Sequence, residues 1–204
     1  MLKNENFWEH EDHPQNQPNH TTQEEKDICY LNAAKLFSLR SKCASRKIGA
    51  VIVKKDNILS WGVNGSPSGI DLCQDPNSEC PRYEFGYKSG GGLHLCPAQH
   101  AERNAILHAA KHGISTDGAT LYCYCGLPCM ECMKAIINSG IKRLVFMTKK
   151  GESEIQKDSD GNLVQYDNGG HLVIYDNLSA VLLKMSDLEF QSYQEGDLGN
   201  IVNI

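Results

Sequence analysis

The 204-residue sequence has no apolar run that approaches the length of a membrane span, and no signal-peptide core near its N-terminus. It also lacks an excess of positive charge, because its formal net charge is −5. These absences exclude a membrane-spanning protein and argue against export and against strongly electrostatic binding of nucleic acid. We therefore expect a cytoplasmic protein with neither a membrane nor a nucleic-acid partner.

The composition predicts one folded domain with two tails. A hydrophobic fraction of 40% is sufficient for a core. Residues 1–20 are polar and proline-containing and are predicted to be a flexible N-terminal tail, residues 21–193 the domain, and residues 194–204 a C-terminal tail. Nine cysteines in a chain without an export signal predict a reducing compartment and metal binding rather than disulfides.

One histidine, one glutamate and two cysteines form the motif that carries the chemistry. His100 and Glu102 precede the pair Cys129 and Cys132, which follows Pro128. Cys129 and Cys132 are three residues apart and share a helix face, whereas His100 and Glu102 point in different directions. One imidazole and two thiolates would hold a catalytic zinc and leave its fourth position for water. The glutamate remains available to move protons.

A CxxC pair on its own is often a redox pair or half of a structural zinc site. The full H-x-E and P-C-x-x-C combination instead resembles the signature of zinc-dependent nucleobase deaminases.

Patterns of capping residues and apolar spacing predict the order of helices and strands. Thr22 and Glu25 form a capping box that opens the first helix. The expected helices are 23–40, 101–112, 129–139 and 177–185, and the expected strands are 48–53, 58–63, 119–125, 143–148 and 188–193, with a small hairpin of 163–166 and 172–175. Strands 119–125 and 143–148 flank a helix and should form a right-handed parallel crossover.

The first helix should bury one apolar stripe, which we expect to comprise Ile28, Leu31, Ala34 and either Leu36 or Phe37. Cys29 on the same helix is interpreted as a buried small hydrophobe.

Cys123 and Cys125 alternate with tyrosines, share a sheet face and are interpreted as packing residues.

Three stretches resemble the deoxycytidylate (dCMP) deaminase family, namely residues 41–69, 100–106 and 136–143. The resemblance implies an α/β, cytidine-deaminase-like three-layer α/β/α fold with a five-stranded mixed sheet. It also implies hydrolytic deamination of dCMP to dUMP and ammonia, a homo-oligomer that is often a hexamer, and the host cytoplasm if the chain is phage-encoded. Residues 123–127, which directly precede the Pro-Cys pair, differ from the sequence usual in the family. The difference affects loop residues expected near the base.

The same resemblance assigns roles to individual residues. Glu102 transfers protons, Asn64 holds the deoxyribose, and the backbone around Ala101 meets the base. Many family members are activated by dCTP with Mg²⁺ and inhibited by dTTP, and the loops that carry Arg46, Lys47 and Gly65 match the family there. The phosphate-binding candidates are Arg46, Lys47, Arg82 and Arg103, although solvation at the surface is the default for each.

A second, structural zinc is predicted from the cysteines that have no packing role. They are Cys43, Cys73, Cys80 and Cys96, and His94 could replace one thiol, most readily that of Cys80. Bacterial and phage members of the resembled family carry cysteines at corresponding places and often bind a second zinc. A zinc cross-link would order the long irregular segment 70–97.

Several other functions share parts of this pattern. A tRNA adenosine deaminase would have the same zinc motif but should present a basic surface. A cytidine nucleoside deaminase and a pterin, guanine or riboflavin-pathway deaminase are further alternatives. A non-catalytic zinc-binding interaction protein is disfavoured, because a structural site needs four ligands and no spare carboxylate.

Overall fold

The protein is seen in a computed structural model that describes residues 21–70, 73, 80–87, 92–148, 156–157, 163–166, 172–174 and 178–199. The expected N-terminal tail, 1–20, lies outside the described residues.

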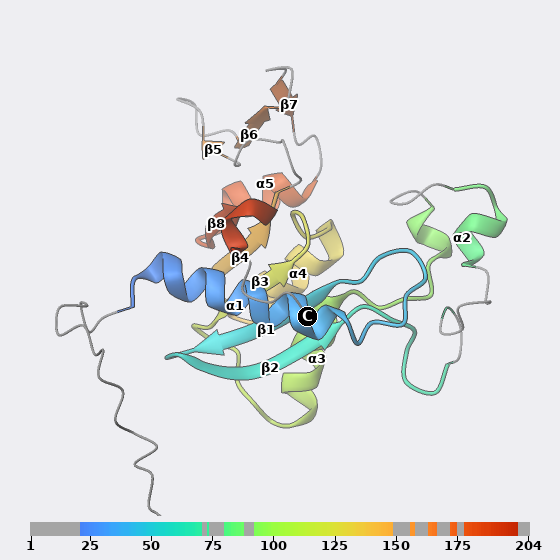
Figure 1. Cartoon of the computed structure of the whole chain (residues 1–204), viewed down its shortest axis with the longest axis horizontal. Coiled ribbons are helices and arrows are strands. Elements are labelled where there is room, and N and C mark those ends of the chain that lie inside the picture. The colour runs from blue at the N-terminus through green and yellow to red at the C-terminus, as the bar shows by residue number, and fades with distance from the viewer. Residues whose placement is uncertain are drawn as a thin grey trace, which may run out of the picture.

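A five-stranded mixed sheet forms the centre of the fold, with the strand order β2-β1-β3-β4-β8 (Figure 1). Its strands are β1 (Gly49–Lys54), β2 (Asn57–Val63), β3 (Thr120–Tyr124), β4 (Arg143–Met147) and β8 (Glu189–Tyr193). β1 pairs antiparallel with β2 and β3, whereas β3 with β4 and β4 with β8 are parallel. The predicted mixed sheet and the parallel crossover are confirmed.

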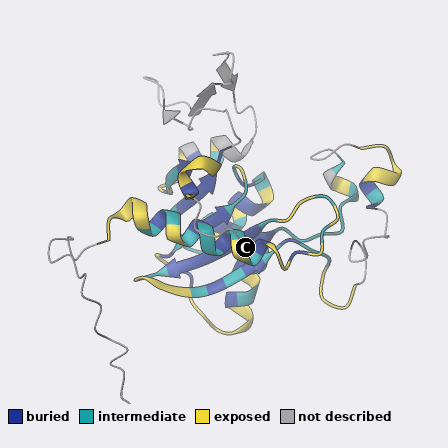
Figure 2. Ribbon diagram, in the orientation of Figure 1, coloured by how far each residue is buried: buried dark blue, intermediate teal, exposed yellow. Residues whose placement is uncertain are grey.

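Helices cover both faces of this sheet, which gives the expected three layers. The helices are α1 (Gln23–Ser38), α2 (Pro81–Glu84), α3 (Ala101–Lys111), α4 (Met130–Asn138) and α5 (Leu178–Met185), with short 3₁₀ turns η1 (Leu93–Leu95) and η2 (Glu195–Leu198). Leu31 and Ala34 of α1 pack on one face of the sheet, and Ala105 of α3 and Met133 of α4 pack on the other. The strands between them are largely buried (Figure 2).

A second, three-stranded antiparallel sheet contains β5 (Gln156–Lys157), β6 (Leu163–Tyr166) and β7 (Leu172–Ile174). The small hairpin expected from sequence corresponds to β6 and β7. No helix in the described part of the chain is both long and apolar enough to cross a bilayer.

Local sequence signals explain where the elements begin and turn. Thr22 caps α1 through the reciprocal capping box with Glu25. Lys55 and Asp56 both have positive φ, of 50° and 60°, in the two-residue turn that joins β1 to β2. Gly62 of β2 lies so close to α3 that a Cβ atom would overlap the backbone of Ala101 and Ala105. This close approach fixes α3 against the sheet.

One expectation about α1 was wrong, and one open alternative is decided. Cys29 is exposed rather than buried. Leu36 is 47% exposed, so the alternative residue Phe37 continues the core stripe. The helix rotates 100° per residue, and Cys29 therefore lies off the face set by Leu31 and Ala34.

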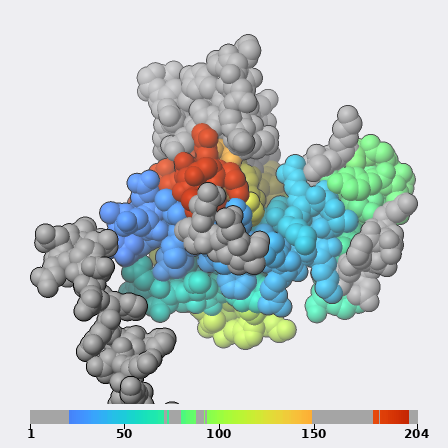
Figure 3. Space-filling view, in the orientation of Figure 1, coloured from blue at the N-terminus to red at the C-terminus, as the bar shows by residue number. Residues whose placement is uncertain are grey.

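Part of the expected C-terminal tail is also folded. Residues 195–198 form η2, and Leu198 is fully buried against α1. Asn32 donates a hydrogen bond to the Leu198 carbonyl, and Lys35 pairs with Glu195 at 2.5 Å. In Figure 3 the red C-terminal stretch lies beside blue α1, which brings the two ends of the described domain together. The segment is mostly polar, so its sequence did not indicate that Leu198 would pack against α1.

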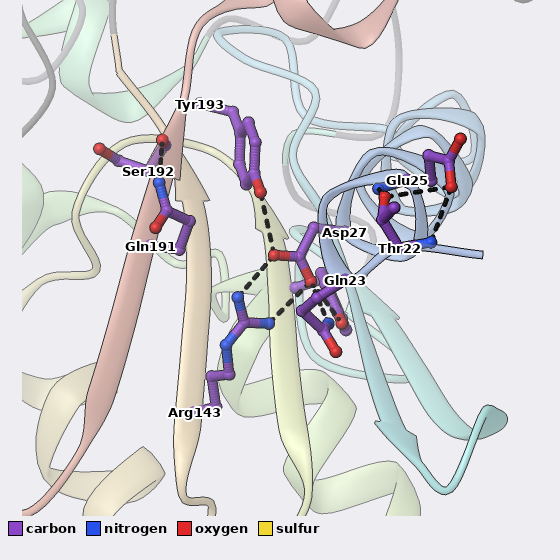
Figure 4. Close-up of polar contacts among 9 residues, drawn as sticks. Thr22, Gln23, Glu25, Asp27, Arg143, Gln191, Ser192 and Tyr193 are labelled. Carbon is purple, nitrogen blue, oxygen red and sulfur yellow. Dashed lines mark hydrogen bonds and ion pairs between the residues drawn. The ribbon is translucent and has the colours of Figure 1, made fainter. Parts of the chain in front are cut away.

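A buried carboxylate joins α1 to three strands (Figure 4). Asp27 is 1% exposed and accepts two hydrogen bonds from Arg143, at 2.7 and 2.5 Å. It also accepts bonds from the hydroxyls of Tyr122 and Tyr193, both at 3.0 Å, and from Gln23 at 2.8 Å. Burial alone would raise the pKa of Asp27, but Arg143, Gln23 and Tyr122 together lower it.

Candidate active site

The three side chains predicted to bind zinc converge at the beginnings of α3 and α4. The Nδ1 atom of His100 lies 3.4 Å from the Sγ atoms of both Cys129 and Cys132. All three potential ligand atoms lie within 4.8 Å of one another. A tetrahedral zinc with ordinary bond lengths would separate nitrogen and sulfur by about 3.5 Å. The predicted catalytic ligand set therefore has the spacing that zinc requires.

The two helix starts place these ligands. His100 is the N-cap residue of α3, Cys129 is the N-cap residue of α4, and Cys132 is in the first turn of α4. Both caps have extended backbone, with ψ of 153° and 164°. Two helix N-termini next to the ligands favour negative charge there.

The electrostatics of the three ligands match a metal site. Hydrogen bonds from Cys132 and from His100 lower the pKa of Cys129 to about 3 despite its burial. Hydrogen bonding to Cys129 raises the pKa of His100, and hydrogen bonding to Cys129 together with burial raises the pKa of Cys132. A cation at this position would replace the protons that the three groups share.

Glu102 lies beside this group on the first turn of α3. It is 3% exposed, and burial raises its pKa. The thiol of Cys125 donates a hydrogen bond to Glu102 Oε1 over 3.7 Å. Glu102 is thus a carboxyl group that can hold or release a proton next to the zinc ligands without being one of them.

A cavity of about 350 Å³ opens onto these groups. Its wall includes His100, Glu102 and Cys129, and also two of the four phosphate-binding candidates, Arg46 and Arg82. Arg82 is 4% exposed. Lys47 and Arg103 are not part of the wall among the described residues.

Asn64 also lines this cavity, but most of the hydrogen bonds of its side-chain amide are made within the protein. Its Oδ1 accepts hydrogen bonds from Ser41 Oγ at 2.7 Å and from the amide of Ile48 at 2.9 Å. Its Nδ2 donates to the Arg46 carbonyl at 2.9 Å. Asn64 therefore holds the loop that carries Arg46, and one amide hydrogen remains for other contacts. Its assigned role toward the deoxyribose stays a prediction, as does that of the Ala101 backbone, which lies at the buried start of α3.

A second, basic cleft of about 240 Å³ is also lined in part by Asn64. Arg40, Lys42 and Gly65 line it together with Asn64, which also belongs to the active-site wall. Of the three residues expected to bind a regulator, only Gly65 is here, because Arg46 faces the active-site cavity and Lys47 faces neither. Arg40 and Lys42 were not anticipated, since nothing in their local sequence distinguishes them from surface cations.

Some of the residues expected to hold a second zinc lie near one another. Cys73 and Cys80 are 4% and 3% exposed. Burial, followed by the thiols of Cys80, Cys43 and Cys96, raises the pKa of Cys73 to about 11. His94 is exposed, and its ring contacts Tyr87 edge-on at 5.8 Å. Among described residues, none of these belongs to a group of three whose ligand atoms all lie within 4.8 Å. The second zinc stays a prediction.

Cys125 packs against the core as expected, but sequence reasoning missed that it also lines the active-site cavity. Cys123 does pack in the core, fully buried, but Cys125 lies at the cavity wall and contacts Glu102. Hydrogen bonding with Cys123, and then burial, hold the pKa of Cys125 well above its usual value. The sequence feature that could have indicated this position is the difference between residues 123–127 and the family's usual sequence.

Comparisons with known proteins agree with this geometry. Residues 24–148 match the family described as the cytidine and deoxycytidylate deaminase zinc-binding region. A deoxycytidylate deaminase of Enterobacteria phage T4 is 40% identical over an alignment that covers 57% of this chain and 74% of that enzyme. One from Schizosaccharomyces pombe is 34% identical over 60% of this chain, but the match spans only 37% of the yeast enzyme.

The dCMP deaminase of cyanophage S-TIM5, solved with dCMP and dUMP, has a similar structure. The comparison gives a TM-score of 0.57 and 28% identity, and covers 85% of this chain and 100% of the cyanophage chain. The shared sequence region, the sheet order and the ligand group all lead to one assignment. The chain belongs to the deoxycytidylate deaminase family, within the zinc-binding cytidine and deoxycytidylate deaminases.

Proposed function

We propose that the protein catalyses the zinc-dependent hydrolysis of dCMP to dUMP and ammonia. The observation that carries this proposal is one cavity that contains zinc ligands, a buried carboxyl group and two arginines. The ligands and the carboxyl group suit hydrolysis of an amino group on a base, and the arginines suit a nucleotide phosphate.

His100, Cys129 and Cys132 would hold the zinc, which when bound supplies a Lewis acid that lowers the pKa of a water molecule. Glu102 takes a proton from that water and delivers it to ring nitrogen N3. It then takes the second proton of the water from the oxygen bonded to C4 and passes it to the amino group on C4. The water oxygen forms the new bond to C4, the bond from C4 to the amino nitrogen breaks, and ammonia leaves. The raised pKa of Glu102 suits a group that must both accept and donate protons.

Arg46 and Arg82 are proposed to bind the 5′-phosphate. A planar guanidinium binds phosphate oxygens through two parallel hydrogen bonds, and a buried one does so with little competition from water. Arg82 is the stronger candidate because it is almost fully buried in the cavity wall. This is also the feature that favours a nucleotide over a free nucleoside.

Steady-state kinetics with dCMP, deoxycytidine and tRNA test the proposal. Arg82→Gln should raise KM for dCMP by about 10- to 100-fold, the value of a lost charged hydrogen bond, and should leave any activity on deoxycytidine unchanged. Lys47→Gln is the matched control, because it removes one positive charge from an exposed position outside the cavity. Turnover of deoxycytidine or tRNA in preference to dCMP would contradict the assignment.

Activation by dCTP with Mg²⁺ and inhibition by dTTP are proposed to act at the basic cleft beside Asn64. Arg40 and Lys42 supply positive charge for a triphosphate. Gly65 in this cleft pairs with Gln99 through two backbone hydrogen bonds, of 3.1 and 2.8 Å, and Gln99 directly precedes His100. A nucleotide that shifts Gly65 would therefore shift the start of α3.

Rate measurements against dCMP concentration test this regulation. In Lys42→Gln, the response to dCTP and dTTP should weaken while the unstimulated rate is retained, and Lys47→Gln should respond like wild type. Hyperbolic curves that neither triphosphate alters in wild type would rule the regulation out.

A structural zinc held by four of Cys43, Cys73, Cys80, Cys96 and His94 is also proposed. The burial of Cys73 and Cys80 and the influence of the other two thiols on the pKa of Cys73 support it. Rotation of these side chains would have to bring the sulfurs together around the ion, since they are not yet in that arrangement.

Assembly into a homo-oligomer, with a hexamer as the expected form, is the last part of the proposal. Large apolar side chains are exposed on neighbouring elements, including Leu39, the residue that caps the C-terminus of α1, at 65%, Ile58 of the edge strand β2 at 45% and Leu107 of α3 at 53%. Burial of such a surface between copies would be favourable. Light scattering on wild type and Leu39→Arg measures the mass of the assembly and tests its dependence on this surface.

A further inference from the structure

A second group of three potential metal ligands lies beside the zinc ligands. Its members are Glu102, Cys123 and Cys125, and their ligand atoms all lie within 4.8 Å of one another. Cys123 is in β3, and Cys125 follows the end of that strand. Both thiols contact the hydrophobic cluster that also contains Ala101 and Ala105 of α3. The group is therefore held by the central sheet and one helix.

The geometry suits a cation that prefers sulfur. With ordinary zinc bond lengths and tetrahedral angles, two sulfurs lie about 3.8 Å apart, and sulfur and oxygen about 3.5 Å apart. The observed distance from Cys125 Sγ to Glu102 Oε1 is 3.7 Å. Two thiolates and one carboxylate would bring three negative charges to a divalent ion. The soft sulfur ligands select zinc or cadmium over magnesium or calcium.

Burial and access also fit. Cys123 is fully buried and Glu102 is 3% exposed, so a cation held between them would be shielded from water. Glu102 and Cys125 both belong to the wall of the active-site cavity. An ion in solution can therefore reach the group through the substrate cavity, with Cys123 as its deepest ligand.

We propose that Glu102, Cys123 and Cys125 form an inhibitory site for a second thiophilic divalent cation, separate from the zinc held by His100, Cys129 and Cys132. Binding replaces the two thiol protons, which pass to solvent. It also engages the carboxylate that must accept and donate protons in deamination. Excess metal then stops turnover without removing the catalytic zinc. The inhibition rests on the proposed function, whereas the binding itself does not.

Cadmium titration of the full-length, zinc-loaded protein tests the site through two separate readouts. The first is metal bound per chain, measured by mass spectrometry after desalting, together with the ultraviolet charge-transfer absorption of cadmium thiolate. The second is the rate of dCMP deamination, expressed for each protein as a fraction of its own rate before cadmium is added. Any uptake at cysteines outside this group is common to wild type and to variants of Cys123 or Cys125, and cancels when these proteins are compared.

The variants are Cys123→Val and Cys125→Ala, with Cys29→Ser as a control that changes an exposed thiol on α1. Wild type and the control should bind about one more cadmium per chain than either variant, because a site with one thiolate loses most of its affinity. Their rates should fall by about 100-fold or more at saturation, the contribution of a general acid–base group. The rates of the two variants should change little.

Circular dichroism establishes that each variant is folded, and two variants are used so that one remains if the other fails. Equal uptake by wild type and a folded variant would overturn the site. Extra uptake in wild type without loss of rate would overturn the inhibition. If no protein deaminates dCMP, the proposed function fails, but the difference in uptake still decides whether the metal site exists.

Discussion

Replacing Asp27 by asparagine should destabilise the fold strongly, although the residue is outside the active-site wall. The carboxylate is the shared acceptor for Arg143, Tyr122, Tyr193 and Gln23, so the change removes the charge that compensates a half-buried guanidinium. Breaking one partner of a buried ion pair costs about 3–5 kcal/mol. The Arg143 side chain keeps 20% exposure, so we expect a value near the lower limit, about 3 kcal/mol.

The effect should depend on pH in a defined direction. The network lowers the pKa of Asp27 below its unfolded value of about 3.9. A carboxylate with a lowered pKa contributes stability that is fully present above the unfolded pKa and is lost as the pH falls through the folded pKa. The difference between wild type and Asp27→Asn should therefore be constant from pH 7 to about pH 5 and shrink below about pH 4.

Urea unfolding followed by circular dichroism, at neutral and at acid pH, measures this free energy. Asp56→Asn is the control, because it breaks the exposed ion pair with Lys26, in which the Asp56 side chain is 61% exposed. An exposed pair contributes less than about 1 kcal/mol. If Asp27→Asn costs no more than Asp56→Asn, or if its cost is the same at every pH, the account of this network is refuted.

Three further predictions concern the site. Glu102→Gln should keep its zinc, measured by metal analysis, and lose more than about 10⁴-fold in turnover, since one residue serves several proton transfers; near-normal dCMP deamination would remove Glu102 from its role. Gly62→Ala should lower the free energy of unfolding by about 1–3 kcal/mol or more and weaken zinc retention, because the new Cβ meets the start of α3. Thermal unfolding measures the loss, and Gly196→Ala, whose Cβ would meet no atom within 4 Å, should be close to neutral in the same measurement. Cys73→Ser should reduce the metal content from about two zinc ions per chain to one while the site of His100 remains loaded; one zinc per chain in wild type would eliminate the second site.

Elements defined by neighbouring residues were predictable from sequence. The capping box at Thr22, the short connection between the strands expected at 48–53 and 58–63, and the apolar strands all depend on interactions within a few residues, and all three occur. The convergence of His100, Cys129 and Cys132 was also predictable, because the chemistry of a catalytic zinc fixes the types of ligand and the spacing of Cys129 and Cys132 on one helix. The capping box, the turn and the Cys129–Cys132 pair are constraints over a few residues, whereas His100 lies 29 residues before Cys129 and was recognised from the motif.

Contacts between distant segments were not predictable in this way. Asp27 reads as an ordinary polar residue of an exposed helix, and its burial follows only when Arg143 and Tyr193 arrive from strands more than a hundred residues away. Leu198 is a single apolar residue in a polar segment, and its value as an anchor depends on the position of α1. Cys125 has the alternation of a packing residue, which does not reveal that the strand ends just before it.

The position of α3 on the sheet shows why the motif alone does not determine the geometry of the site. Spacing requires only that His100 and Glu102 diverge by about 200° around α3, which leaves the rotation of that helix on the sheet undetermined. The rotation is set by small residues, since Gly62 admits the helix backbone and Ala101 and Ala105 are fully buried beneath it. A larger residue at any of these positions would move the helix outward and carry the imidazole away from the thiols of α4. The ligand group therefore depends on close packing at residues that carry no chemistry, and this packing turns four reactive side chains in a sequence into one site.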